Sequence, residues 1–375
     1  MNQSIIKLRH EIHKYPEVSN KEYNTSKRIL NYISEFKPDE IVHLGKTGLA
    51  FVFIGKDKGK TIVFRAELDA LPIKEKTNVE YASKNDYVAH SCGHDGHMTI
   101  LTGLAQKIAE NRPKKGRIIL LFQPAEEVEQ GAKDVVENPL FIQFKPDYMF
   151  ALHNVPEFEK HKILLKKGCF ASASKGMTIK LTGKTAHAAE PENGINPANA
   201  ISEIIKTLHQ IRDNKNIFES FILLTFIHIQ LGEISFGTSP GYAELRVTLR
   251  AFENKDMKLL TDKCEKIINE IAKKEKLACD ICYSEVFPAT VNNDDCVDIV
   301  EQSAAQLNLD VQKLNKPFRW SEDFGYYTEK YSACFFGLGS GKNQPKLHNP
   351  EFDFPDDIIE TGINIFYKIY ENNSK

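Results

Sequence analysis

The sequence lacks the features that mark membrane proteins and disulfide-stabilised secreted proteins. No apolar run among its 375 residues reaches the ~18 residues that suggest a transmembrane helix. The segment Met1–Ile5 contains no apolar signal core. Seven cysteines, an odd number at irregular spacing, do not form the pattern of a disulfide framework. We therefore expect a reduced, cytoplasmic protein that does not associate with membranes.

An excess of charge of one sign is also lacking. The chain carries 49 Lys and Arg residues against 51 Asp and Glu residues, a net charge of −2, and the two signs are interspersed. Such a balance gives no electrostatic footprint for nucleic acid or for an anionic membrane. Internal repeats and low-complexity tracts are absent as well. We expect no nucleic-acid partner and no membrane partner.

What the sequence does contain is a dense group of metal-ligand residue types in the segment Ala-His-Ser-Cys-Gly-His-Asp-Gly-His at 89–97. Thiolate and imidazole are ligands that borderline divalent metals take. Cys92 and His94 are two residues apart, so in an extended segment they project to the same side. The alternative is a polar loop with hydrogen-bonded histidines. Two ligands do not hold a catalytic metal, so further ligands must come from distant positions.

Helical and strand patterns alternate in the first part of the chain, which predicts a largely parallel, mixed α/β sheet. In such sheets ligands bind outside the carboxyl ends of the strands. Several polar residues follow predicted strands, namely Glu67 and Asp69, the pair Glu126 and Glu127, His153, and finally His348. We therefore expect them at one edge, together with Cys92 and His94. The predicted strands of this sheet cover residues 50–54, 61–64, 117–122, 146–152 and 333–338.

The chain length favours two domains, because single cores tend to split beyond ~250–300 residues. From about residue 173 the pattern becomes strand–helix–strand–strand–helix–strand, which is the order of a ferredoxin-like α+β sandwich. We predict an inserted domain over 173–286. A discontinuous α/β/α catalytic, metal-binding domain then covers 1–172 and 287–375.

The candidate donors outnumber what one ion needs. A single catalytic zinc-like ion takes three protein ligands before leaving a water position, so five donors fit a pair of metals better. Thiolate, imidazole and carboxylate together favour Zn, Mn, Co or Ni over Ca or Mg. Such a pair activates a water molecule and polarises a carbonyl group. The five predicted metal ligands are Cys92, His94, Glu127, His153 and His348.

Adjacent glutamates are unlikely to face one ion in the same way. We assign Glu127 to the metals and Glu126 to general acid–base catalysis, in which it takes a proton from the activated water and returns it to a leaving amine. A solvated loop is the alternative for this pair. The histidines His10 and His13 of the first predicted helix are expected on a solvated helix face, and His187 by itself fits an ordinary loop histidine.

Several motifs together support a family resemblance. The chain resembles the dinuclear metal-dependent amidohydrolases of the hippurate hydrolase, N-acyl-amino-acid deacetylase and auxin-conjugate hydrolase group, relatives of aminoacylase and of two-domain metallo-exopeptidases. The match covers nearly the whole chain. The motifs that carry it are Leu8–His13 with Pro16-Glu17, Arg65–Pro72, His90–His97, Phe122–Glu127, Leu152-His153, Gly183–His187, Ser321–Phe324 and Leu347–Pro350.

The resemblance implies roles that the residue patterns alone do not assign. It implies that Cys92 bridges two metals, that Glu126 is the base and that Asp69 is a catalytic support near the metals. It implies that the inserted domain is a lid and forms a homodimer, and that His187 reaches the partner subunit's site to bind substrate and stabilise the oxyanion. Arg250 matches a relative's substrate-carboxylate arginine, and an exposed strand residue is the alternative for it.

The chain also departs from the family pattern. Exopeptidase relatives carry His where Glu67 stands, so metal coordination here must follow the Cys92 and His94 variant. The lid segment of type Asn-Val-Ile-Pro is replaced by Phe-Gly-Thr-Ser-Pro-Gly at 236–241. How a substrate carboxylate is bound is therefore left open.

The sequence-based hypothesis is a metal-dependent amidohydrolase with two divalent metal ions per subunit, either Zn, Mn, Ni or Co. Its substrate is an N-acyl amino acid or a similar small amide, which it cleaves to a carboxylate and an amine. One alternative is a dipeptidase or carboxypeptidase-type metallo-exopeptidase. Another is a catalytically silent relative that binds a small ligand or protein, against which the intact Glu126 and five ligand residues argue.

Overall fold

The computed structural model describes residues 3–213 and 215–374, and the chain forms two compact units. The first unit comprises Met1–Phe170, Thr290–Pro317 and Asp323–Lys375, and the second comprises Ala171–Ala289 and Phe318–Glu322. The sequence analysis assigned 318–322 to the catalytic domain. These residues bond within the second unit, where the backbone N–H of Ser172 donates to the carbonyl oxygen of Phe318 at 3.2 Å.

The first unit is built on an eight-stranded mixed sheet with strand order β1-β2-β4-β3-β5-β16-β6-β15. The central strands β4, β3, β5 and β16 run parallel, as expected, whereas β1, β2 and the β16–β6 pair add antiparallel neighbours. The strands are β1 (Glu40–Leu44), β2 (Gly48–Ile54), β3 (Asp57–Glu67), β4 (Lys115–Gln123), β5 (Tyr148–Pro156), β6 (Ile163–Leu165), β15 (Val311–Lys313) and β16 (Ala333–Gly341).

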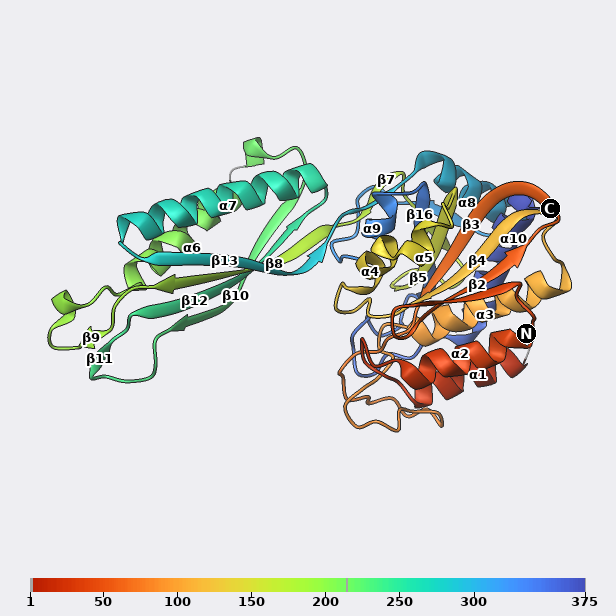
Figure 1. Cartoon of the computed structure of the whole chain (residues 1–375), viewed down its shortest axis with the longest axis horizontal. Coiled ribbons are helices and arrows are strands. Elements are labelled where there is room, and N and C mark those ends of the chain that lie inside the picture. Colours follow the sequence, from red (N-terminus) through yellow and green to blue (C-terminus); the bar gives the residue numbers. More distant parts are fainter. Residues whose placement is uncertain (1–2, 214, 375) are drawn as a thin grey trace. The chain divides into compact units, whose positions relative to one another are not determined.

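Helices cover both faces of this sheet (Figure 1), which makes the predicted three-layer arrangement. Alternation along β3 sets the faces, since Ile62 and Phe64 enter the main apolar core while Arg65 points to the opposite face. The core face carries α1 (Gln3–Lys14), α2 (Tyr23–Ser34), α3 (His94–Glu110), α8 (Asp294–Gln306) and α10 (Ile359–Ser374). The opposite face carries α4 (Gly131–Glu137), α5 (Pro139–Ile142) and α9 (Gly325–Thr328).

The second unit has the predicted ferredoxin-like order of elements. Its sheet is antiparallel with strand order β10-β12-β8-β13, and its two helices contact that sheet. Every second residue of β12 is buried, which is the period of a strand with one covered face. The elements are β8 (Ala173–Thr182), α6 (Ala198–Asp213), β10 (Ile222–Leu231), β12 (Tyr242–Ala251), α7 (Asn254–Lys274) and β13 (Ala278–Phe287).

Short strands complete the structure and were not predicted. Two to four residues with little periodicity carry too weak a pattern to be recognised from sequence. These strands are β7 (Gly168–Ala171), β9 (Ala186–His187), β11 (Thr238–Ser239) and β14 (Thr290–Asn292).

The expected solvated position of His13 is wrong. Its side chain is 1% exposed, and Nδ1 lies 2.8 Å from Asp95 Oδ2. His10 is half-buried, with Nε2 2.8 Å from Asp356 Oδ2. The error has a simple cause, because both carboxylate partners lie far away in the sequence.

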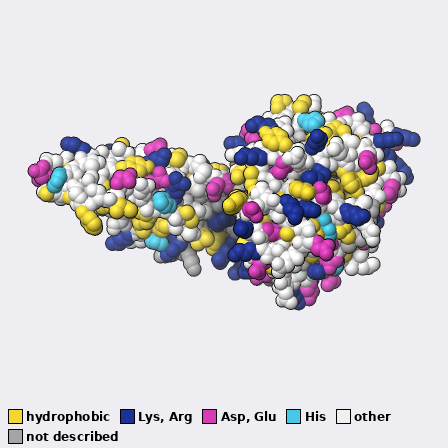
Figure 2. All heavy atoms as spheres, turned by 90° about the horizontal axis from the view of Figure 1, so that it is seen from below, with side chains coloured by type: hydrophobic (Ala, Val, Ile, Leu, Met, Phe, Trp, Pro, Cys, Tyr) yellow, Lys and Arg dark blue, Asp and Glu magenta, His cyan; other side chains and the backbone are white. Residues whose placement is uncertain are grey.

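The surface agrees with the balanced composition. Figure 2 shows Lys and Arg side chains interspersed with Asp and Glu side chains over the face that it presents. Among the residues that the structure describes, no helix combines the length and the apolar character needed to cross a membrane.

Candidate metal centre

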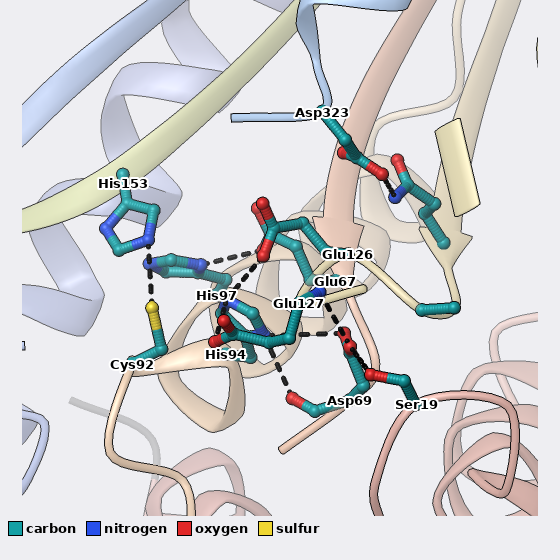
Figure 3. Close-up of polar contacts among 12 residues, drawn as sticks. Ser19, Glu67, Asp69, Cys92, His94, His97, Glu126, Glu127, His153 and Asp323 are labelled. Atoms are coloured by element: carbon teal, nitrogen blue, oxygen red, sulfur yellow. Dashed lines mark hydrogen bonds and ion pairs between the residues drawn. The ribbon is translucent and has the colours of Figure 1, made fainter. Parts of the chain in front are cut away.

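The predicted metal ligands gather at the edge formed by the carboxyl ends of the parallel strands. This is the edge at which chain segments leave β3, β4, β5 and β16, so residues far apart in the sequence meet there. Figure 3 shows several of these side chains pointing toward one another. Glu127 follows β4, His153 lies within β5, His348 follows β16, and Cys92 and His94 lie at the start of α3.

The donor atoms form two overlapping triplets that share one sulfur. In the first, the ligand atoms of Cys92, His94 and His153 all lie within 4.8 Å of one another. In the second, the same limit holds for Cys92, Glu127 and His348. Three donors around each of two points, with one donor common to both, is an arrangement suited to a pair of ions. The shared member is the residue that the family resemblance implies as the bridge.

Unusual backbone conformations aim these ligands. Gly93 caps α3 with φ of +96°, and a Cβ there would lie 2.3 Å from Asn154 Oδ1, so only glycine fits between the two ligands that flank it. Ala125, next to the glutamate pair, has φ of +53°, and His348 has φ of +64°. A left-handed conformation costs a non-glycine residue roughly 1–2 kcal/mol. Such residues concentrate at functional sites.

The buried histidines are oriented by backbone carbonyl groups. The Nδ1–H of His94 donates to the carbonyl oxygen of Asp69 at 2.9 Å, and that of His153 donates to the carbonyl oxygen of Asn154 at 2.8 Å. Each Nε2 therefore faces the cluster with its lone pair, and His153 Nε2 lies 3.4 Å from Cys92 Sγ. His94 Nε2 is buried and has no hydrogen-bond partner among the described residues. A buried acceptor without a donor fits a metal ligand.

The electrostatic balance of the cluster also fits a cation. Burial, followed by the negative charges of Glu127 and Glu126, raises the pKa of the Cys92 thiol well above its usual range. Burial disfavours the charged form of His94, but the hydrogen bond with Asp69 and the charge of Glu67 outweigh it and raise its pKa to about 10, so a metal ion would have to replace a proton on Nε2 before the lone pair could serve as a donor. Negative charge thus dominates this buried space. A divalent ion would balance that charge and stabilise the thiolate.

Asp69 connects two of the ligand segments. It is fully buried, and its Oδ2 accepts hydrogen bonds from Ser19 Oγ at 2.6 Å and from the backbone N–H of Glu127 at 3.0 Å. Its own carbonyl oxygen fixes the ring of His94, as described above. Asp69 therefore holds one ligand from each triplet, and its predicted support role remains a prediction.

Glu126 lies beside the same donors. Its side chain is 8% exposed, and its Oε2 is 3.9 Å from His94 Nε2. His348, by contrast, has a side chain that is 53% exposed. The first unit thus buries one side of the ligand cluster and leaves it reachable from solvent at the His348 side.

The two remaining predicted site residues belong to the second unit. His187 is exposed on β9, and its Nδ1 accepts the backbone N–H of Ala189 at 3.1 Å, so a neutral ring carries its proton on Nε2. Arg250 is half-buried on β12, and its Nη1 donates to the carbonyl oxygen of Arg319 at 2.9 Å and to Ser321 Oγ at 2.8 Å. These two hydrogen bonds, to Arg319 and Ser321, give Arg250 a structural role that the sequence did not predict.

Sequence reasoning missed a buried polar network beside the ligands. Arg65 donates to Glu67, to Gln123 Oε1 at 2.9 Å and to Asp323 Oδ1 at 2.5 Å, while Glu67 Oε2 accepts from His97 Nδ1 at 2.7 Å. Burial opposes ionisation of Glu67, but the charges of Arg65 and His97 lower its pKa well below the usual value. The signal was present, because Arg65 and Glu67 interrupt an apolar buried strand two residues apart.

Comparison with known proteins places this arrangement among metallohydrolases. A sequence profile of peptidase family M20/M25/M40 matches residues 63–372. A hippurate hydrolase of Campylobacter jejuni is 33% identical over 97% of this chain and 94% of its own length, and an N-acetyldiaminopimelate deacetylase of Bacillus velezensis is 28% identical over 99% of both. The crystal structure of a dinuclear metal binding peptidase from the M20 family of Bacillus subtilis has a TM-score of 0.84 and 26% identity, covering 98% of this chain and 96% of that one.

Proposed function

The chain belongs to peptidase family M20/M25/M40, and we propose that it is a metal-dependent amidohydrolase acting on an N-acyl amino acid or a similar small amide. The products are a carboxylate and an amine. One observation carries the proposal, namely that two ligand triplets share Cys92 directly beside the carboxylate of Glu126. The relatives named as hippurate hydrolase and N-acetyldiaminopimelate deacetylase support the substrate class.

The proposed cofactor is a pair of divalent ions, either Zn, Mn, Ni or Co. Cys92, His94 and His153 would hold one ion, and Cys92, Glu127 and His348 would hold the other. Mixed sulfur, nitrogen and oxygen donors favour these metals over Mg or Ca. When bound, such a pair makes water more acidic and polarises the substrate carbonyl group.

The proposed proton carrier is Glu126. Its carboxylate is largely buried among the ligand side chains, where it can accept a proton from the attacking water and return it to the departing amine nitrogen. Glu127, held through its backbone N–H by Asp69, is fixed in the neighbouring position. Both carboxylates lie close to His94 Nε2, Glu126 Oε2 at 3.9 Å and Glu127 Oε1 at 3.8 Å, and the proposal gives them separate roles because Glu127 also lies beside Cys92 and His348.

The second unit is proposed to serve as lid and dimerisation domain. The Nε2–H of His187 points away from its internal bond to Ala189, so it is available to donate to an oxyanion. Arg250 is retained as a candidate for the substrate carboxylate. Support for a homodimer comes from exposed apolar residues on the edge strand β10 and the loop that follows it. These residues are Ile227, Ile229, Leu231, Ile234 and Phe236.

A cytoplasmic location is proposed on the state of the thiols. The seven cysteines, all within the described residues, form no disulfide bond, and Cys92 can act as a ligand only as a reduced thiolate. A reducing compartment meets that requirement.

The decisive experiment replaces the proposed proton carrier. The Glu126→Gln variant keeps the size of the side chain and should bind both metal ions while losing at least 10²-fold in turnover, the usual lower limit for general acid–base catalysis. Glu110→Gln, at the exposed end of α3, is the matched control and should keep full activity. Full activity in Glu126→Gln with wild-type metal content would refute the assignment.

A substrate panel separates the candidate activities. We expect hydrolysis of hippurate or of N-acetyl amino acids to exceed hydrolysis of free dipeptides, measured as the amine released by the metal-loaded enzyme. Faster cleavage of dipeptides would favour the exopeptidase alternative. Binding of these amides with no turnover under any of the four metals would favour the silent relative.

A further inference from the structure

Helix α1 carries a buried charged group that the proposed mechanism does not use. Arg9 is 0% exposed, and its Nη1 donates to Asp95 Oδ2 at 3.1 Å and to Asp353 Oδ1 at 2.8 Å. Its Nε forms an ion pair with Asp356 Oδ1 at 2.6 Å. His13, one turn further along α1, contacts the same oxygen of Asp95. We call Arg9, His13, Asp95, Asp353 and Asp356 the Arg9 cluster.

Each carboxylate of this cluster belongs to a segment that carries a proposed ligand. Asp95 is the residue after His94 in the first turn of α3. Asp353 and Asp356 follow His348 by five and eight residues. One guanidinium therefore connects two parts of the chain that are more than 250 residues apart in the sequence. A buried arginine fixes several carboxylates at once through its planar set of donors.

The segment that carries His348 has no regular secondary structure, and side chains, including Phe352 and Phe354 in the apolar core, hold it in place. It runs from the end of β16 at Gly341 without a helix or strand until residue 356, and His348 itself has left-handed backbone. Two backbone hydrogen bonds join it to other parts of the described chain, from the N–H of His348 to the carbonyl oxygen of Ser91 at 2.8 Å and from the N–H of Lys76 to the carbonyl oxygen of Pro350 at 2.8 Å. Arg9 adds two ion pairs to this segment, with Asp353 and Asp356, and His10 forms a further pair with Asp356.

Tyr81 adds a second hold on the same segment. Its ring lies 4.7 Å from the guanidinium carbon of Arg9, and its hydroxyl donates to Asp353 Oδ2 at 2.7 Å. Tyr81 comes from the irregular stretch that precedes Cys92 in the sequence. The Arg9 cluster thus lies where the chain segments that carry Cys92, His94 and His348 meet.

The other ligand triplet is supported differently. His153 lies on the central strand β5, paired with β3 and β16 on its two sides, and its ring is fixed by the carbonyl oxygen of Asn154. That support does not involve α1. The two triplets should therefore respond differently when the Arg9 cluster is disrupted.

We propose that Arg9 is a positioning residue that fastens the His348 segment to the start of α3 and so sets the affinity of the Cys92–Glu127–His348 triplet for its metal ion. The inference rests on the proposed function, because it takes these three side chains as metal ligands. Removing Arg9 would take away its ion pairs with Asp353 and Asp356, and would leave the His348 segment held by Tyr81, by His10 and by its buried phenylalanine side chains. The triplet that contains His153 also includes Cys92, and its His94 lies next to Asp95, but the bonds that orient His94 and His153 come from Asp69 and Asn154, so this triplet should be affected less.

The test measures two zinc dissociation constants by titrating chelator-stripped protein with zinc in competition with a chromophoric chelator. Arg9→Met should weaken one ion by about 10–100-fold, the size of effect seen when groups that orient metal ligands are removed. The other ion should bind within about threefold of the wild type. His348→Ala identifies the ion expected to weaken, because it removes a ligand of that triplet alone.

Two further variants supply a second test of the inference and a control for it. Asp353→Asn combined with Asp356→Asn frees the His348 segment while leaving Arg9 paired with Asp95, so it should reproduce the selective loss even if Arg9→Met does not fold. Arg112→Met is the matched control, since Arg112 pairs with Asp39 at 2.9 Å on the surface, and it should leave both constants unchanged.

The outcomes separate the inference from the proposed function. Unchanged constants in the folded variants, or equal weakening of both ions, would overturn the positioning role while leaving the metal pair in place. A wild-type protein that binds no pair of ions would overturn the proposed function and this inference together. Selective weakening of the ion that His348→Ala also loses would establish the role of Arg9.

Discussion

At the scale of single residues, the candidate centre depends on which atoms face inward. Backbone carbonyl oxygens accept Nδ1–H of His94 and of His153, so both Nε2 atoms are directed at the shared sulfur and the carboxylates. This orientation could not be predicted from the sequence, because it depends on carbonyl groups of Asp69 and Asn154 that only the fold brings near. Cys92 and His94 could be proposed as ligands from the sequence, since the motif Cys-Gly-His-Asp-Gly-His brings thiolate and imidazole close together.

The residue that sequence reasoning misplaced is equally informative. His10 and His13 lie in a basic, histidine-rich helix segment, a pattern that led to the prediction of a solvated helix face, although His13 and the neighbouring Arg9 are buried. Their partner Asp95 lies more than 80 residues away, so only the tertiary structure reveals that they are buried. A basic residue in a helix is therefore not a reliable sign of exposure, because a distant acidic residue can pair with it in the folded core.

The pairing of His13 predicts a pH dependence of stability. Burial disfavours the charged ring, but the hydrogen bond and charge of Asp95, with Glu75 in support, raise the pKa of His13 to about 9 from 6.5. A raised pKa in the folded state means that this contribution, a few kcal/mol at most, is complete below about pH 6.5 and is lost as the pH rises to about 9. We expect His13→Gln to be less stable than the wild type at pH 6 and nearly equal above pH 9.5. Urea unfolding of both proteins between pH 6 and pH 9.5 gives the difference in their free energies of unfolding. A difference that does not change with pH would contradict the assigned pairing.

At the scale of secondary structure elements, pattern strength decided what could be predicted. The buried strand β4 and the long helices α6 and α7 have clear periodicity, and their positions match the expectation within a few residues. β1 has the pattern of an exposed edge strand, with a single buried residue, and was missed. The strand order and register could not be predicted from the sequence either. For example, β4 lies between β2 and β3, although these two strands follow one another in the chain.

The edge strand β10 supports a prediction about assembly. Ile229 is 49% exposed on this edge, so Ile229→Lys should turn a dimer of the 42.6 kDa chain into a monomer, because it places a charge inside an apolar contact. Leu140→Lys on α5, where the leucine is 47% exposed, is the control and should remain dimeric. Light scattering after gel filtration gives the masses. A wild-type monomer, or a variant with the wild-type mass, would be incompatible with dimerisation through β10.

At the scale of the whole molecule, the chain builds one centre from widely separated segments. The ligands span residues 92 to 348, and the long insertion between β7 and β14 separates the last of them from the rest. The alternation of strands and helices predicted that the carboxyl ends of the strands would meet, which is why the ligand set could be proposed from sequence. The supporting contacts of Asp69, Arg65 and Arg9 could not, because each joins segments whose proximity follows from the fold alone.

The central claim is that one sulfur serves two ions, and it is tested most directly by the number of divalent ions that Cys92→Ala binds per chain. Elemental analysis of the wild type after loading and gel filtration should give two ions. Cys92→Ala should lose both, because Cys92 belongs to both triplets, whereas His348→Ala should keep one. A Cys92→Ala protein that still carries two ions would contradict the account.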